Sequence, residues 1–366
     1  MTGKKWVKTF LILSLVTVVL VGATVFVVDP FFHYRKPNDR LYYWLNDQRC
    51  QNNGITRHFE YDSIITGTSM AENFKASEFD SLFGTNSIKV CYSGATYKEI
   101  NDNLKLAFES GHQVKYVLRV LDYSLLVRDK DEMRTDMGEY PEYLTNDNIL
   151  DDVKYLLNRE VILNYTATCL ARFVTGHEPG HTSFDEYSFI VDESYGRGYV
   201  LWDRTQFGNP EVVNEASSEE IKMMTDNIAQ NVTELAKQHP ETEFIYFFPP
   251  YSMAYWGEVR EDGDLNKMLE YVKMASEQIL ECDNIHLYSF AKELEITENL
   301  DIYRDAGHYS PDINSWMIEK IAECEVGGDV DALSMYRLTK DNAGQYYEEL
   351  ARMLNEYDYN KLIVKE

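Results

Sequence analysis

The chain has 366 residues, with 35 Lys and Arg against 61 Asp and Glu, which gives a formal net charge of −26. This length is enough for the core of one large domain or two ordinary ones, and the 44% hydrophobic and 13% aromatic content excludes a disordered chain. The strongly negative charge excludes DNA or RNA binding by counterion release, so nucleic acid is not an expected partner.

The N-terminal segment is predicted to be a membrane anchor. Residues 10–28 form an apolar run without a charged side chain, and three lysines precede it in residues 1–9. Such a run is long enough to span a bilayer, and the positive-inside rule places residues 1–9 in the cytoplasm and the rest of the chain outside. A cleaved signal peptide is the alternative. Its apolar core is usually shorter and ends in a small-x-small site, whereas this run ends in four large residues at Val28, so the sequence favours an uncleaved anchor.

Residues 29–60 are predicted to be a linker, and a regular alternation of strands and helices follows it. The predicted strands are residues 61–66, 87–91, 114–121, 243–248 and 284–288. The predicted helices are residues 97–110, 218–238, 265–282 and 312–324. This order predicts an α/β fold in residues 61–325, a parallel sheet with helices on both faces in a three-layer, flavodoxin-like arrangement. In such sheets, ligands bind at the carboxyl ends of the strands.

Two segments fall outside the regular alternation. Residues 125–215 are too long for an ordinary connection, so we expect an insertion with helices of its own, and a lid over the site is one interpretation. Residues 326–366 have helical apolar spacing and are predicted to be a C-terminal helical extension that docks on the domain.

A serine follows the first predicted strand. Residues Gly67 to Ser69 place the Ser69 hydroxyl at the carboxyl edge of the sheet, before a predicted helix whose N-terminal N–H groups can hold a developing oxyanion. The alternative is that Ser69 only caps that helix. Gly94 follows the second strand and offers a backbone N–H at the same edge, although a simple turn glycine is the alternative.

Near the C-terminus, Asp305 and His308 lie three residues apart in a loop before the last helix of the domain. A carboxylate at this spacing can orient an imidazole and hold it in one tautomer, as a general base requires. Of the eight histidines, only His308 has such a neighbour pattern. A histidine on the surface or satisfied in the core is the alternative for any single case.

Together these motifs resemble the SGNH/GDSL hydrolase superfamily. Its first block is similar to Gly67-Thr68-Ser69, its second to Gly94, and its last to Asp305-Ala306-Gly307-His308, over roughly residues 60–325. The resemblance implies that Ser69 is the nucleophile, His308 the general base and acid, and Asp305 the orienting carboxylate. It also implies an oxyanion hole made by the backbone N–H groups of Ser69 and Gly94.

The chain departs from the family pattern at two positions. Thr68 replaces the usual aspartate before the nucleophile, and Asp122 stands after the third strand, where the family commonly supplies an asparagine side chain. An ionised aspartate cannot donate a hydrogen bond, so another donor is needed, and Asn73 and Asn101 are candidates. Tyr251, at the end of the fourth strand, is a candidate for lining the acyl or sugar pocket, with core packing as the alternative.

Within the superfamily, the layout is similar to a membrane-anchored branch. That branch includes DltD, the D-alanine transfer protein of teichoic-acid D-alanylation, and the O-acetyltransferases of exopolysaccharide systems. The resemblance implies a single-pass protein of the bacterial cell membrane that transfers or hydrolyses acyl groups on a cell-envelope glycan. Its implied partners are an acyl donor and a membrane-bound O-acyltransferase, and no cofactor is expected. A catalytically silent glycan-binding or scaffold protein with the same fold is the alternative.

The charge distribution bears on the substrate. Residues 1–28 contain three lysines and no acidic residue, so the external part holds 32 basic against 61 acidic residues, a charge of −29. This charge repels polyanionic teichoic acid within the screening length of about 8–10 Å. A neutral or zwitterionic polysaccharide, or a carrier-bound acyl donor, therefore fits equally well.

One further motif is predicted to be a decoy. Residues 177–181 match the zinc motif His-Glu-x-x-His, which needs both histidines on one helical face. Pro179 and Gly180 break that helix, so a loop is expected. The five cysteines are scattered without a Cys-x-x-Cys pair, and no metal site is predicted.

Overall fold

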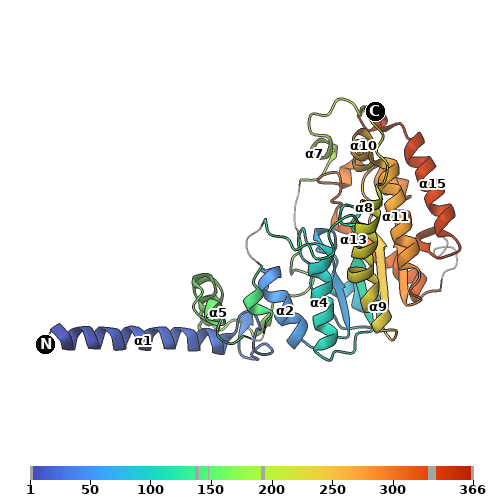
Figure 1. The fold of residues 1–366 in the computed structure, drawn as a ribbon. Helices are drawn as coiled ribbons and strands as arrows, with labels where there is room; N and C mark the ends of the chain where they lie inside the picture. Colours follow the sequence, from blue (N-terminus) through green and yellow to red (C-terminus); the bar gives the residue numbers. More distant parts are fainter. Residues whose placement is uncertain (1–2, 137–139, 147, 191–193, 329–334, 364–366) are drawn as a thin grey trace. The chain divides into compact units, whose positions relative to one another are not determined.

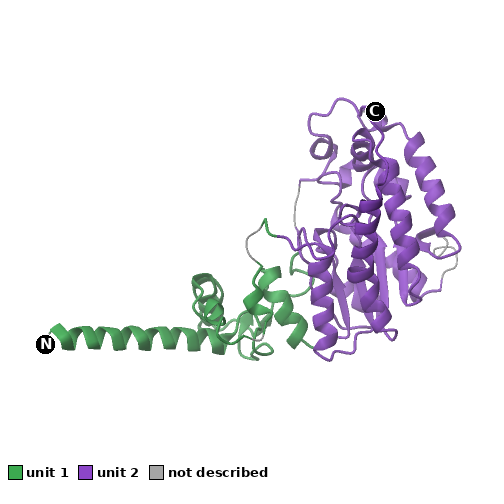
Figure 2. Cartoon of the chain, viewed as in Figure 1, with its two compact units in different colours: residues 1–60, 135–188 green, residues 61–134, 189–366 purple. Residues whose placement is uncertain are grey.

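The computed structural model describes residues 3–136, 140–146, 148–190, 194–328 and 335–363. The chain divides into two compact units, shown in Figure 2. Unit 1 consists of residues 1–60 and 135–188, and unit 2 of residues 61–134 and 189–366.

Unit 1 begins with α1 (Gly3–Val28), a helix of 26 residues. The helix starts before the apolar run predicted for residues 10–28, because the preceding lysines continue it. Its most apolar stretch has a mean hydropathy of 2.8 and is only 11% buried, and it is the only helix in the described part of the chain that is long and apolar enough to cross a membrane. These properties are compatible with a membrane anchor or a signal sequence.

The other elements of unit 1 are short. They are β1 (Tyr42–Tyr43), α2 (Gln48–His58), η3 (Glu142–Leu144), α5 (Val153–Leu156), η4 (Val161–Thr166), α6 (Ala167–Val174) and β5 (Gly180–His181). β1 pairs in parallel with β5, and α5 and η4 contact α1. The sequence predicts a linker at residues 29–60 and one insertion at residues 125–215. The structure instead groups residues 135–188 with the first sixty, since Val25 and Phe31 share a core with side chains of η3, α5 and η4.

Unit 2 is built on a six-stranded sheet with the order β3-β2-β4-β6-β7-β8. The strands are β2 (Ser63–Thr66), β3 (Ser87–Lys89), β4 (Tyr116–Val120), β6 (Glu243–Phe248), β7 (Ile285–Ser289) and β8 (Arg337–Leu338). The first five strands in this order pair in parallel, and β8 pairs with β7 in the antiparallel direction. The prediction of a mixed α/β fold with a mostly parallel sheet is therefore confirmed.

Helices connect the strands of unit 2 (Figure 1). The α-helices are α3 (Ala76–Phe83), α4 (Tyr97–Glu109), α7 (Arg197–Leu201), α8 (Ser218–Ile228), α9 (Glu234–Gln238), α10 (Met253–Glu261), α11 (Leu265–Ile279), α12 (Leu294–Thr297), α13 (Pro311–Glu325) and α15 (Ala343–Glu356). The short turns are η1 (Ser69–Ala71), η2 (Tyr123–Leu125), η5 (Ala229–Thr233), η6 (Leu300–Ile302) and η7 (Tyr359–Leu362). Capping boxes at Thr96 and Ser217 start α4 and α8, as expected for Thr or Ser three residues before Glu.

The helix predicted for residues 218–238 contains an irregular segment. Its middle, η5, is a π-helical turn, which leaves backbone carbonyls available for other donors. The buried Arg119 guanidinium, from β4, donates a hydrogen bond of 2.7 Å to the carbonyl of Asn231. This buried cation fixes η5 against the sheet. The apolar periodicity of the sequence does not reveal the π-helical turn or its contact with Arg119.

The C-terminal extension differs from the prediction in one respect. Residues 326–366 were expected to be helical, but β8 adds a strand to the edge of the sheet before α15 begins. α15 packs on α11, where the hydroxyl groups of Tyr347 and Ser276 lie 2.6 Å apart. A strand of two residues is too short to leave an alternating pattern in the sequence.

Candidate active site

The structure brings together the serine, histidine and aspartate that the sequence singled out. The Oγ of Ser69 lies 2.8 Å from Nε2 of His308, although the two residues are 239 positions apart. On the other side of the ring, Nδ1 of His308 lies 2.8 Å from Oδ2 of Asp305. With the Nδ1 proton held by the carboxylate, Nε2 is left to accept the proton of the Ser69 hydroxyl.

The turn after β2 positions Ser69. Gly67 has a φ of 145°, and a Cβ there would lie 3.0 Å from the Cβ of Ala71 and 3.2 Å from the Cβ of Val120. Thr68 caps η1, since its Oγ1 accepts a hydrogen bond from the Met70 N–H at 3.3 Å. The chain therefore turns sharply at the end of the strand, where only glycine fits, and presents the partly exposed Ser69 at the carboxyl edge of the sheet.

A closed loop holds His308. Tyr303 and Tyr309 form an isolated antiparallel bridge at its base. Inside it, Oδ1 of Asp305 accepts hydrogen bonds from the N–H groups of Gly307 at 2.9 Å and His308 at 2.8 Å. The N–H and hydroxyl of Ser252, which caps α10, both donate to the carbonyl of Ala306. Asp305 thus closes the turn and orients the imidazole at the same time.

The electrostatics of Asp305 favour its charged form. Burial acts to raise the pKa of this carboxyl, but hydrogen bonds from the His308 ring and from the backbone N–H groups of His308 and Gly307 outweigh it and lower the pKa to about 2. Asp305 is therefore ionised at neutral pH and can stabilise an imidazolium ion on His308.

Ser69 and His308 face a narrow pocket. The side chains that line it with them include Asn73, Tyr195 and Arg304, and its volume is about 10 Å³. The Arg304 Nε lies 3.8 Å from Oδ2 of Asp305, so this cation at the pocket is paired with the ionised carboxylate. This space is about the size of one water molecule, so the pocket leaves no room for a long acyl chain.

Gly94 lies beside the nucleophile turn. The N–H of Tyr92 donates to the carbonyl of Gly67 at 2.9 Å, which makes the turns after β2 and β3 neighbours. Gly94 has a φ of 60°, and the Arg134 guanidinium packs so closely on it that a Cβ would lie 1.7 Å from Nη1. The same Nη1 donates to the carbonyl of Ser93 at 2.8 Å. Arg134 is not predictable from the sequence, because it lies about forty residues further along the chain in no recognisable motif.

The two departures from the family pattern are hydrogen-bond partners. Asp122 is 5% exposed, and its Oδ2 accepts a hydrogen bond of 2.6 Å from Oγ1 of Thr68. Its Oδ1 accepts a short hydrogen bond from the Tyr251 hydroxyl, and the Tyr251 ring lies against Gly307 in the histidine loop. Burial raises the pKa of Asp122, against the lowering effects of these hydroxyls and of His308. Asp122 therefore links the nucleophile turn to the histidine loop.

The other predicted site residues have different positions. Asn73 lines the pocket, and its Oδ1 accepts a hydrogen bond of 2.7 Å from the N–H of Ile190. Asn101 lies on α4 and donates to the carbonyl of Gln230 in η5, so the structure does not bring it to the pocket. Tyr251 is buried beneath the site and is not one of the residues that line it.

The His-Glu-x-x-His motif has no helical geometry. His177 lies in an exposed turn and His181 at the end of β5, as expected from the Pro-Gly pair between them. Within the described residues, no group of three or more His, Cys, Asp or Glu side chains is arranged to hold a metal ion.

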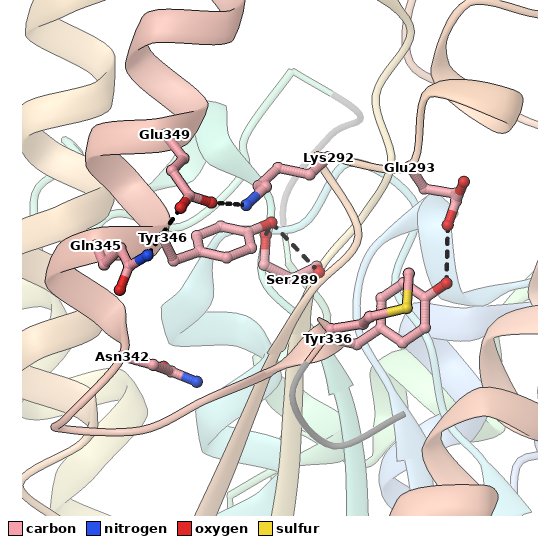
Figure 3. Close-up of a pocket in the computed structure, with 9 residues that line it drawn as sticks. Ser289, Lys292, Glu293, Tyr336, Asn342, Gln345, Tyr346 and Glu349 are labelled. Carbon is pink, nitrogen blue, oxygen red and sulfur yellow. Dashed lines mark hydrogen bonds and ion pairs between the residues drawn. The ribbon is translucent and has the colours of Figure 1, made fainter. Parts of the chain in front are cut away.

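A second cavity of unit 2 has a volume of about 360 Å³ and lies between the end of β7 and α15 (Figure 3). Its polar side chains largely pair with one another. Lys292 forms an ion pair with Glu349, and the Tyr336 hydroxyl donates to Glu293 at 2.8 Å. The lining residues include no histidine, so this cavity lacks the nucleophile and base of the Ser69 pocket.

Comparisons with known proteins do not identify the chain. No protein-family model matches it, and neither the curated proteins nor the solved structures gave a match.

Proposed function

We propose that this chain is a membrane-anchored, extracytoplasmic serine acyltransferase or esterase of the SGNH type that modifies a cell-envelope polysaccharide. The observation that carries the proposal is the hydrogen-bonded series Ser69–His308–Asp305, with 2.8 Å at both contacts. Nucleophile, base and orienting carboxylate are then all within the distances that covalent acyl transfer needs.

The topology supports the SGNH assignment. β3 lies on one side of β2 and β4 on the other, so the connections through α3 and α4 run in opposite directions. Since parallel crossovers are right-handed, α3 and α4 then cover opposite faces, which gives the three layers of this fold. α13 contacts α3, and α4 contacts η5, in agreement with this division. Ser69 and Gly94 then lie at the carboxyl edge, near the reversal of strand order.

The chemistry follows from the geometry. Ser69 Oγ attacks the carbonyl carbon of an acyl ester while His308 Nε2 takes the hydroxyl proton. The backbone N–H groups of Ser69 and Gly94 stabilise the oxyanion, and the ionised Asp305 stabilises the imidazolium. The leaving alcohol departs with the proton from His308, and an acyl-Ser69 ester remains. An acceptor hydroxyl then gives its proton to His308 and takes the acyl group, and His308 passes that proton to the departing Ser69 Oγ, which restores the free serine and the neutral imidazole.

The pocket and the charge narrow the substrate. The narrow pocket, of about 10 Å³, disfavours a long fatty chain, and a short acyl group such as acetyl or D-alanyl is proposed. The net charge of the chain disfavours a polyanionic acceptor, so a neutral or zwitterionic glycan is the proposed acceptor. Transfer is proposed over hydrolysis because of the anchor, with a membrane-bound O-acyltransferase as the supplier of the acyl group.

A retained anchor is supported by the packing of α1. Val25 and Val28, in the last two turns of the helix, are 0% and 2% exposed. Val25 belongs to the core of unit 1 together with Phe31, Tyr155 and Val161. Cleavage after the apolar run would remove part of that core, which a disposable signal peptide would not supply. The lysines before the helix support a cytoplasmic N-terminus.

The test in cells measures the product. In the native host, ester-linked acetate and D-alanine on purified envelope polymers are measured with the wild-type protein and with Ser69→Ala and His308→Ala. Both variants are expected to lose the modification, at protein levels matched by immunoblot. Unchanged acyl content in both variants would refute the proposal.

A silent glycan-binding or scaffold protein is the second candidate. It is favoured by Asp122, which accepts hydrogen bonds where the family supplies a donor, and by Arg134, which packs on Gly94. Two observations would together support this alternative. The acceptor polymer would bind with equal affinity to the wild type and to Ser69→Ala, and no acyl-enzyme would form in either protein.

A further inference from the structure

Unit 1 contains a segment that packs on α1 inside its apolar span. A Cβ at Gly22 would lie 3.7 Å from Cδ2 of Leu157 and 3.9 Å from Cβ of Leu156. Gly22 lies six residues before Val28, about 9 Å along the helix axis at 1.5 Å per residue. A side chain that contacts α1 at this position lies at the same depth as the apolar helix itself.

The segment is tied to the end of α1. The Tyr155 hydroxyl donates to Oδ1 of Asp29 at 2.9 Å and accepts the N–H of Phe31 at 3.1 Å. Asp29 also accepts the N–H groups of His33, at 3.0 Å, and Tyr34, at 2.9 Å. α5 therefore has a fixed place beside the last turns of α1 and is not a loose loop.

The segment also carries large apolar side chains that are exposed. The exposed large apolar side chains of residues 149–174 are Ile149, Leu150, Val153, Leu157, Leu163, Leu170, Phe173 and Val174. Ile149, Leu150 and Val174 each have more than 80% of their surface exposed. Soluble monomers rarely expose so many large apolar side chains within one short segment, and such a group marks a binding surface.

The exposed set follows helical spacing. Leu163, Ala167, Leu170 and Val174 recur at i, i+4, i+7 and i+11 along η4 and α6, so they share one exposed face. The other face buries Val161, Tyr165 and Cys169 against the core of unit 1. A helix that is apolar on both faces fits an environment with protein on one side and lipid on the other.

We propose that residues 149–174 lie in the outer interface of the bilayer that α1 spans, with their exposed apolar side chains among the lipid acyl chains. The inference rests on the retained anchor of the proposed function, but not on catalysis. Continuity with α1 selects lipid as the occupant, because lipid surrounds the helix at the depth of Gly22. The Arg35 guanidinium, 4.3 Å from the centre of the Phe26 ring, is in a position to reach the headgroups from the same end of α1.

This docking gives unit 1 a second membrane contact. A protein held by one spanning helix can tilt freely relative to the membrane surface. An interfacial segment fixed to the last turns of that helix restricts this tilt, because the same side of unit 1 must then face the lipid. Unit 1 is then a membrane-attachment unit formed by two segments that lie far apart in the sequence.

The test uses the full chain in lipid bilayers. Leu163→Trp and Val174→Trp are reconstituted in phosphatidylcholine vesicles that carry brominated acyl chains, and Val213→Trp, an exposed position of unit 2, is the matched control. Fluorescence in excess of the parent protein, which has five tryptophans, reports the new side chain. We expect several-fold stronger quenching by bromolipid at positions 163 and 174 than at 213, and the reverse order for quenching by acrylamide in water.

Two results would overturn the inference. Strong acrylamide quenching at positions 163 and 174, with bromolipid quenching no greater than the control, would place the segment in water. Protection from both quenchers would show that a second copy or another protein covers it. Intact mass verifies that α1 is present in the reconstituted chain, and modification of Ser69 is measured on the same sample. A failed docking is therefore distinguishable from a lost anchor and from an inactive site.

Discussion

The two units distribute their apolar side chains differently. In unit 2, most apolar residues of the sheet and of the surrounding helices are buried, with scattered exceptions such as Trp202 and Val213, and polar groups gather at the carboxyl ends of the strands around Ser69. In unit 1, a small core is shared by α1 and the segment 149–174, and large apolar side chains remain on the outside of both. The apolar side chains of unit 2 thus have the distribution expected of a domain folded in water. Those of unit 1 have the distribution expected of a structure that contacts both water and lipid. Chemistry and membrane attachment can therefore be tested separately.

The largest expected effect comes from the nucleophile. Ser69→Ala should lower the hydrolysis of p-nitrophenyl acetate by about 10³-fold or more, because the covalent route is lost. The melting temperature should stay close to that of the wild type, since the removed hydroxyl is partly exposed. Leu163→Ser in unit 1 is the matched control and should keep full esterase activity in detergent. Equal loss in both variants would contradict the separation of the units.

The second-largest loss of activity is expected on substitution of the orienting carboxylate, Asp305. Asp305→Asn keeps the size of the side chain but removes the charge, and activity should fall by about 10²–10⁴-fold through a lower kcat. Because the pKa of Asp305 drops from an ordinary 3.8 to about 2 on folding, its stabilising effect is present above pH 4 and is lost as the pH falls towards 2. Between pH 4 and pH 2, the free energy of unfolding of Asp305→Asn should therefore fall less with decreasing pH than that of the wild type. An identical acid-unfolding curve for wild type and variant would contradict the assignment.

The buried link beneath the site should affect both stability and activity. Asp122→Ala leaves the hydroxyls of Thr68 and Tyr251 without their acceptor, so we expect a loss of about 2–5 kcal/mol in the free energy of unfolding. The milder variants Thr68→Val and Tyr251→Phe each remove one hydroxyl and should cost about 1–2 kcal/mol. Denaturant titration measures these values. If Tyr251→Phe also lowers kcat without a change in KM, the link positions the histidine loop, whereas an unchanged kcat would limit it to stability.

In unit 1, the tie between α5 and α1 should have a smaller and local effect. Tyr155→Phe removes the hydrogen bonds to Asp29 and to the N–H of Phe31, at a cost of about 1–3 kcal/mol for the buried groups. Limited proteolysis should then cut residues 149–174 faster, while esterase activity remains. Loss of activity in this variant would show that the two units depend on each other.

The smallest expected effect concerns the zinc-like motif. His177→Ala, and treatment with a chelator, should leave the esterase activity within twofold of the untreated wild type, because His177 lies in an exposed turn. A large loss of activity in either experiment would reveal a metal requirement that the described residues do not suggest.

The sequence predicted unit 2 far better than unit 1, for physical reasons. Buried parallel strands such as β6, residues 243–248, are continuous apolar runs, and helices such as α4 and α8 carry their own periodicity and capping boxes. Ser69, Gly94 and His308 each follow or precede such an element, so their meeting at one edge follows from the topology. Unit 1 depends instead on contacts between α1 and residues 135–188, and no local pattern records which distant segment fills a given core.

Some details of the site were also beyond the sequence. Arg134 contacts Gly94 from a stretch of the sequence without periodicity. Thr68 and Asp122 are two unrelated positions in the sequence, and only the fold shows that they share a hydrogen bond. Pairings of this kind depend on the approach of two turns in space. The two-residue strand β8 was missed because it takes its conformation from pairing with β7.

The most direct test of the central claim is covalent modification of the nucleophile. The full chain in detergent is treated with a fluorophosphonate, and the modified residue is identified by peptide mass spectrometry. The account predicts one adduct, on Ser69, that is absent from Ser69→Ala and forms far more slowly in His308→Ala. An adduct that persists in Ser69→Ala, or that forms at an unchanged rate without His308, would contradict it.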